Sequence, residues 1–145
     1  TDSDQLSFDL FDKVDSNRIE VKFSRVQKKA ELKITDSNLF KALQCEANRD
    51  IMYHEWQDYD WDCNIQQVKK EEFDILFYGV FFKDMVLIFK VHSEDIGKEM
   101  RYSNKQHRGN TGEGQFHLNR QTFKHHLDYH LFKTLTYGEL LEWLK

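Results

Sequence analysis

The sequence predicts an α/β fold of the α+β kind, in which a central mixed β-sheet is flanked by helices. Two pairs of apolar segments predict strands, because a short polar turn joins the members of each pair. The pairs are 8–14 with 19–26 and 73–82 with 85–91. Three segments with helical spacing of apolar residues predict the helices. They cover 36–47, 121–133 and 136–144.

The first predicted hairpin turns at Asp15-Ser16-Asn17, and its second strand carries alternating charged and apolar residues. Alternate residues of a strand point to the same face. Glu20 and Lys22 are therefore expected on one face. The other face is expected to point toward a core and holds Ile19, Val21 and Phe23.

The remaining segments are interpreted in chain order. Residues 53–63 are acidic and aromatic, and they predict an irregular connection whose rings cover the sheet, form an oligomer contact or stack on bases. The second hairpin is almost continuously apolar, as in strands buried on both faces. A polar loop with glycines, 102–115, precedes a short strand at 116–118. Thr136 and Glu139 have the spacing of a capping box that opens the last helix.

Composition indicates one soluble domain spanning residues 1–145. No apolar run is long enough to cross a membrane, and no secretory signal is visible, so a cytoplasmic protein is expected. Cys45 and Cys63 are expected to be free thiols in a reducing compartment.

The net charge of −4 is unevenly distributed along the chain. Residues 18–33 and 98–133 each carry an excess of four positive charges, whereas 34–97 carry an excess of seven negative charges. Two basic segments could contact a phosphate backbone while the protein stays acidic overall. Ordinary solvated faces would give the same pattern.

The first hairpin also holds the residue types that metal-assisted phosphodiester cleavage requires. Carboxylates bind Mg²⁺, and a nearby lysine can orient a water molecule and balance charge. Glu20 and Lys22 supply one carboxylate and the ammonium, and Val21 could add its backbone carbonyl as a metal ligand. An exposed Glu-x-Lys pair is also common as a simple cross-strand ion pair.

Asp9, followed eleven residues later by Glu20-Val21-Lys22, resembles the signature of the PD-(D/E)XK, or restriction-endonuclease-like, nucleases. The resemblance implies that Asp9 and Glu20 hold Mg²⁺ with Val21 and that Lys22 is the catalytic lysine. Phe8 stands where the family has proline. The helix that usually precedes this hairpin has no room in residues 1–6, which suggests a truncated chain or a reduced version of the fold.

The first metal ligand has two candidates. If the hairpin turns about Ser16, antiparallel counting places Asp12 opposite Glu20, whereas Asp9 requires a bulge or a wider turn. Asp9 matches the spacing of the motif better and is the preferred candidate.

Other residues are candidates for DNA contact. The basic run contributes Arg25, Lys28 and Lys29, and the glycine-bearing loop contributes Lys105, Arg108, Asn110 and Gln115. Arginine, asparagine and glutamine can pair with base edges, and lysine can contact phosphates. Four histidines crowd the last third of the chain, where surface or DNA-facing positions are expected: His117, His125, His126 and His130. The spacing of His126 and His130 could also chelate zinc, and His117 with Asn119 allows an HNH-type reading.

These observations predict a Mg²⁺-dependent restriction endonuclease that cuts double-stranded DNA, with a homodimer expected for a symmetric site. One alternative is a repair or recombination nuclease that cuts structured DNA or ends without sequence preference. The other is a catalytically silent DNA-binding domain of the same fold.

Overall fold

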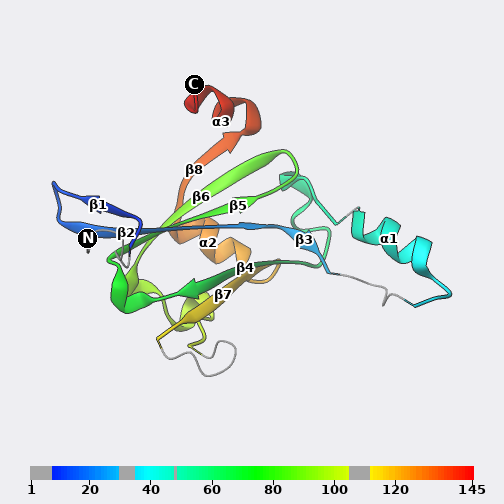
Figure 1. Ribbon diagram of the computed structural model, residues 1–145, viewed down its shortest axis with the longest axis horizontal. Coiled ribbons are helices and arrows are strands. Elements are labelled where there is room, and N and C mark those ends of the chain that lie inside the picture. Colours follow the sequence, from blue (N-terminus) through cyan, green and yellow to red (C-terminus); the bar gives the residue numbers. More distant parts are fainter. Residues whose placement is uncertain (1–7, 30–34, 48, 105–111) are drawn as a thin grey trace, which may run out of the picture.

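The computed structural model describes residues 8–29, 35–47, 49–104 and 112–145. It is an α+β fold with two sheets (Figure 1). The mixed sheet has the order β1 (Leu10–Asp12), β2 (Asn17–Arg25), β5 (Ile75–Phe81), β6 (Met85–His92), β8 (Leu131–Thr136). The smaller antiparallel sheet has the order β3 (Gln27–Lys28), β4 (Trp61–Val68), β7 (Gly114–Asn119). The predicted α+β class with a mixed central sheet is confirmed.

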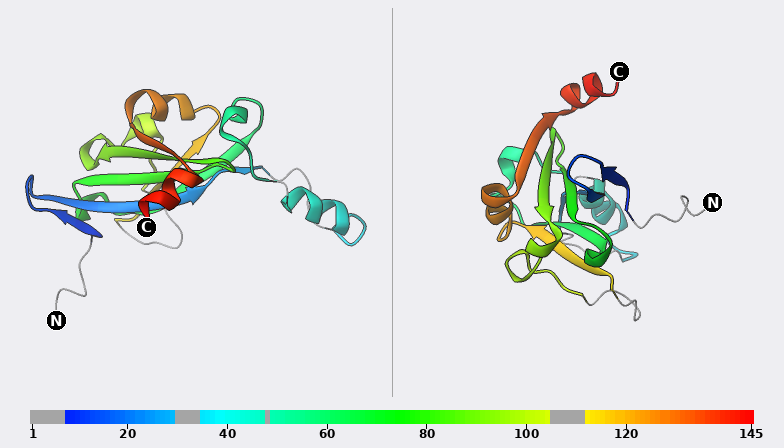
Figure 2. Two further views of the ribbon diagram at one scale, coloured as in Figure 1. Left: turned by 90° about the horizontal axis from the view of Figure 1, so that it is seen from above. Right: turned by 90° about the vertical axis from the view of Figure 1, so that its left-hand side faces the viewer.

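The helices are short, and they differ in how closely they pack on the rest of the molecule. They are α1 (Leu39–Ala47), α2 (Phe123–Tyr129) and α3 (Tyr137–Trp143), with 3-10 turns at η2 (Tyr53–Glu55), η3 (Lys70–Glu72), η4 (Ser93–Asp95) and η5 (Lys98–Met100). Figures 1 and 2 show α1 and α3 extending from the body. Among the described residues, α2 buries Phe123 and His126 in the core, whereas α3 buries no side chain. None of the described helices is both long and apolar enough to cross a bilayer.

The run from β2 to β3 belongs to both sheets. β2 pairs antiparallel with β1 at one edge and parallel with β5 at the other. Val26 still donates its N–H to the Phe81 carbonyl, at 2.9 Å, and β3 then pairs with β4. In Figure 1, β4 leaves β3 and diverges from β2 toward the end where β1 lies. One continuous extended segment therefore joins the two sheets.

The core lies between the sheets and is rich in aromatic rings. Phe123 of α2 is fully buried, and its ring centroid lies 5.2 Å from that of Trp61 and 5.7 Å from that of Phe82. Trp61 donates its indole N–H to the Trp56 carbonyl at 2.8 Å, as a buried ring nitrogen requires. The rings at 53–61 mainly cover the core, although Tyr59 remains 38% exposed.

Two expected elements are wrong. Residues 61–63 begin strand β4 instead of continuing an irregular connection, because Trp61, Cys63 and Ile65 alternate inward. The helix expected over 121–133 ends at Tyr129, and Leu131 begins β8, which pairs with β6. The two hairpins, the strand at 116–118 and the capping box of Thr136 with Glu139 are confirmed.

The faces of β2 are also the reverse of the expectation. The parallel register places Glu20 beside Leu76 and Lys22 beside Tyr78, and both partners are fully buried. Glu20 and Lys22 thus lie on the core side of the mixed sheet. The opposite side carries Ile19, Val21 and Phe23.

Phe23 lies on the outer side and is 57% exposed, yet its ring packs closely on the backbone of Gly79. A Cβ at position 79 would lie 2.2 Å from a ring carbon of Phe23. Gly79 therefore leaves the space that the ring occupies.

His126 is buried, which contradicts its expected surface position. Its Nδ1 lies 2.7 Å from the Tyr78 hydroxyl, and its Nε2 is buried without a hydrogen-bond partner among the described residues. Burial, together with the neighbouring His130 and His125, lowers the pKa of His126 to about 3. The imidazole is therefore neutral in the folded protein at ordinary pH.

We expect stability to fall in acid because of His126. The unfolded chain binds a proton near the ordinary histidine pKa of about 6.5, whereas the folded chain does not until the pH approaches about 3. The free energy of unfolding should therefore lose about 2 kcal/mol from this group on going from about pH 7.5 to about pH 5. Urea unfolding at both pH values measures this loss.

The substitution His126→Gln should weaken the fold at neutral pH and reduce the dependence of stability on pH. The exposed His92 provides a control, because His92→Gln should keep the wild-type slope. An unchanged slope in His126→Gln would contradict the assignment.

Candidate active site

The register of the first hairpin brings Asp9 to Glu20. Leu10 pairs with Ile19 and Asp12 with Asn17, so the turn consists of the four residues 13–16. The Asp9 N–H donates to the Ile19 carbonyl at 3.0 Å, and its Oδ2 accepts the Val21 N–H at 2.8 Å. The Asp9 carboxylate thus accepts the Val21 N–H, which a carbonyl of a neighbouring strand would otherwise accept.

Asp12 lies at the other end of this short strand. Its Oδ1 accepts the N–H of Val14 at 2.9 Å and that of Asp15 at 3.4 Å. Such contacts stabilise a turn. Of the two candidates for the first acid, the structure brings Asp9 to Glu20, and Asp12 closes the turn.

Glu20 and Lys22 form a partly buried ion pair. The Lys22 Nζ lies 3.5 Å from Glu20 Oε1, and the side chains are 26% and 14% exposed, respectively. Burial raises the pKa of the Glu20 carboxyl, the hydrogen-bonded Asp9 carboxyl raises it further, and Lys22 opposes both effects. Two carboxyl groups in contact in a partly desolvated place favour a bound proton or a cation between them.

The donor set fits Mg²⁺. Asp9 and Glu20 supply carboxylate oxygens, which this cation prefers. The N–H and C=O of one strand residue point to the same edge. Because the Val21 N–H points to Asp9, the Val21 carbonyl faces that side too. No cluster of three or more His, Cys, Asp or Glu side chains suited to a metal occurs in the described part of the chain.

A hollow of about 340 Å³ surrounds these groups. Sequence reasoning found three of its residues and missed the rest. The hollow is lined by Phe8, Asp9, Glu20, Lys22, Gln67, Lys69, Glu72 and Glu113. Lys69 and Glu113 form an ion pair of 3.4 Å across it. Apart from Phe8, which precedes β1, the missed residues lie in β4, shortly after it or just before β7. The alternation of Trp61, Cys63 and Ile65 was the available signal for β4.

The predicted DNA-contacting residues that the structure describes do not line this hollow. Arg25 donates to Asp50 at 2.9 Å, and the Lys28 Nζ lies 4.6 Å from the centre of the Tyr59 ring. Lys29 is exposed beside them. Gln115 pairs with Ser103 through two backbone hydrogen bonds. Three further candidates, Lys105, Arg108 and Asn110, lie outside the described residues.

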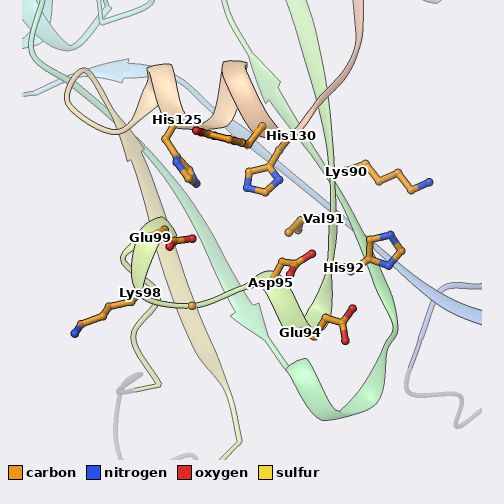
Figure 3. Close-up of a pocket in the computed structure, with 11 residues that line it drawn as sticks. Lys90, Val91, His92, Glu94, Asp95, Lys98, Glu99, His125 and His130 are labelled. Carbon is orange, nitrogen blue, oxygen red and sulfur yellow. The ribbon is translucent and has the colours of Figure 1, made fainter.

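Histidines contribute to a separate hollow of about 840 Å³ (Figure 3). His125 and His130 of the α2 region point toward it, opposite Asp95 and Glu99. Burial and His125 lower the pKa of His130, and the two acids oppose them. Lysines, carboxylates and imidazoles are mixed here, so this hollow selects no single charge.

The two residues of the HNH-type reading have structural partners. His117 Nδ1 lies 3.2 Å from Asp62 Oδ1 across β4 and β7. The Asn119 side chain accepts the N–H groups of Gln121 and Thr122 at 3.0 and 2.9 Å, ahead of α2.

The hairpin therefore brings together one acid from beside β1 and an acid and a lysine from β2. They share a polar hollow on the core side of the mixed sheet. Comparison of the chain with protein-family models, curated proteins and solved structures found no match.

Proposed function

We propose that this protein is a Mg²⁺-dependent DNA endonuclease with a restriction-endonuclease-like core. The observation that carries the proposal is the convergence of Asp9, Glu20 and Lys22 in one partly buried hollow. The contact between two carboxyl groups favours a cation, and the lysine offers a proton-donating cation beside the same oxygens. A simple surface ion pair needs neither the second acid nor the hollow.

Each side chain of the site has its own role in the proposed reaction. Asp9 and Glu20 would hold the cation, with the Val21 carbonyl as a further ligand. Bound Mg²⁺ supplies stabilisation of negative charge on the phosphate and a lowered pKa for a bound water. Lys22 orients the attacking water or a phosphate oxygen through its ammonium. Burial on the core side strengthens each of these electrostatic interactions.

Cleavage at a defined sequence, by a homodimer at a symmetric duplex site, is the form of this activity that we propose. The same hollow would also serve a repair or recombination nuclease. The cutting pattern distinguishes the two, because a sequence-specific enzyme leaves discrete fragments and a non-specific one leaves a smear.

We expect plasmid and phage DNA to be cut in Mg²⁺ and cutting to drop at least about 100-fold in Lys22→Ala and in Glu20→Ala. Gel electrophoresis of timed digests measures the rates. Lys13→Ala, in the exposed hairpin turn, is the control and should cut normally. Cutting that survives both site substitutions would refute the proposal, as would the absence of cutting in Mg²⁺ and Mn²⁺.

Asp9 and Asp12 provide a matched pair for the first acid. Asp9→Asn should reduce cutting by at least about 100-fold, because the metal loses a charged ligand. Asp12→Asn removes the same charge from the same hairpin and should keep most of the activity. Equal losses in both variants, at equal thermal stability, would contradict the assignment of Asp9.

Mg²⁺ binding should strengthen with increasing pH in the acidic range. The pKa of Glu20 is raised, so its carboxylate takes up a proton at a higher pH than an ordinary glutamate and then binds metal less well. Lys22→Met removes the group that opposes this shift and should move the midpoint to higher pH. Calorimetric titration at several pH values measures this, with Lys13→Met as control. A midpoint that moves down would contradict the prediction.

A further inference from the structure

A second hollow opens where two strands part. β3 and β4 pair at Gln27 with Asp62 and at Lys28 with Trp61, and β4 then diverges from β2 (Figure 1). The space between β2 and β4 is about 400 Å³, within the range of about 300–1,000 Å³ that small-molecule sites occupy. It is lined by Lys22, Phe23, Ser24, Asn64, Ile65, Gln66 and Gln67. We call it the amide hollow.

The amide hollow borders the candidate active site. Lys22 and Gln67 line both spaces. The acids lie on one side of Lys22, and the amides lie on the other. A nucleotide chain with its phosphate at the acids would therefore place a neighbouring group at the amides.

The backbone of β4 is specially shaped at this point. The pairing of β4 with β7 shifts register between Ile65 and Val68. Gln67 adopts a φ of 56°, in the left-handed region that residues other than glycine seldom occupy. Bulges and such conformations gather at functional sites, where they redirect side chains. Here the irregularity brings Gln67 to the border of the two hollows.

Asn64 supplies an independent observation. Its Oδ1 is buried and has no hydrogen-bond partner among the described residues. A buried acceptor without a donor is costly, and native proteins rarely keep one. The same residue lines the amide hollow, and turning its amide toward that space would bring the Oδ1 to a ligand's donor.

The chemistry of the lining selects the ligand. Phosphate offers acceptors alone, whereas an exposed base edge offers amino donors beside ring acceptors. Amide side chains carry a donor and an acceptor side by side and pair with adenine through two hydrogen bonds. Apart from Lys22 at the border, every residue of the amide hollow is uncharged.

We propose that the amide hollow binds the base of a nucleotide next to the scissile phosphate and reads its edge through Asn64 and Gln66. The inference rests on the proposed nuclease function and deepens it by assigning the selection of one base. Lys22 at the shared border links the base that is read to the phosphate that is cut.

The test uses a duplex pool with a randomised central segment, cut in Mg²⁺, with the new ends sequenced. Wild type should show a base preference at one position beside the cut. Asn64→Ala and Gln66→Ala should reduce this preference roughly 10-fold. Gln57→Ala changes an exposed amide outside both hollows and should keep it. Gln66 is exposed, so its truncation tests the subsite even if Asn64→Ala folds poorly.

The outcomes separate the two proposals. Cutting with a base preference that both amide variants leave unchanged overturns the subsite and leaves the nuclease standing. If the wild-type protein does not cut, the nuclease proposal fails. The subsite is then tested by sequencing the DNA of the same pool that the Lys22→Ala protein retains in Ca²⁺. Retained DNA with a preference that Gln66→Ala removes supports it. No retention, or retention without such a preference, overturns it.

Discussion

The incomplete edge of β2 is the constraint on which the rest of the structure depends. β5 pairs with one edge of this strand from Ile19 to Arg25, which fixes the faces of β2. At the other edge, β1 pairs with β2 as far as Ile19, and the pairing with β4 starts at Gln27 of β3. Among the described residues, no strand pairs with the stretch between Ile19 and Gln27 at that edge. The Asp9 carboxylate enters at one end of this gap, and the amide hollow occupies the other.

The site depends on which face of β2 points toward the core. Glu20 and Lys22 lie beside the buried Leu76 and Tyr78, at the rim of the core. Transfer of charged groups away from water is unfavourable unless opposite charges or hydrogen bonds compensate it. Lys22 compensates Glu20 only in part, because burial and then the Asp9 carboxyl both raise the pKa of Glu20. The folded chain thus keeps an electrostatic conflict at this rim, and a divalent cation would relieve it.

Local patterns predicted the parts of the molecule that local geometry determines. Alternation alone placed Glu20 and Lys22 together, and the spacing of Thr136 and Glu139 identified a helix start that the structure has. The choice between Asp9 and Asp12 depended on the length of a turn that several registers could satisfy. The strand at Leu131 depended on β6, which offers a free edge, and this tertiary pairing overrides a helical pattern of apolar residues. The φ of Gln67 follows from a bulge between distant strands, which no short-range pattern reveals.

Phe23 has a consequence for anyone who alters the surface of this protein. By exposure it looks like a position to exchange for a polar residue or to carry a label. Its ring nevertheless fills the space above Gly79, a residue without a side chain in a central strand. Removing the ring would open the backbone of β5 to water directly behind the strand that carries Glu20 and Lys22. Solubility engineering and probe attachment should therefore use other exposed apolar positions, such as Val14 in the hairpin turn, which is 90% exposed.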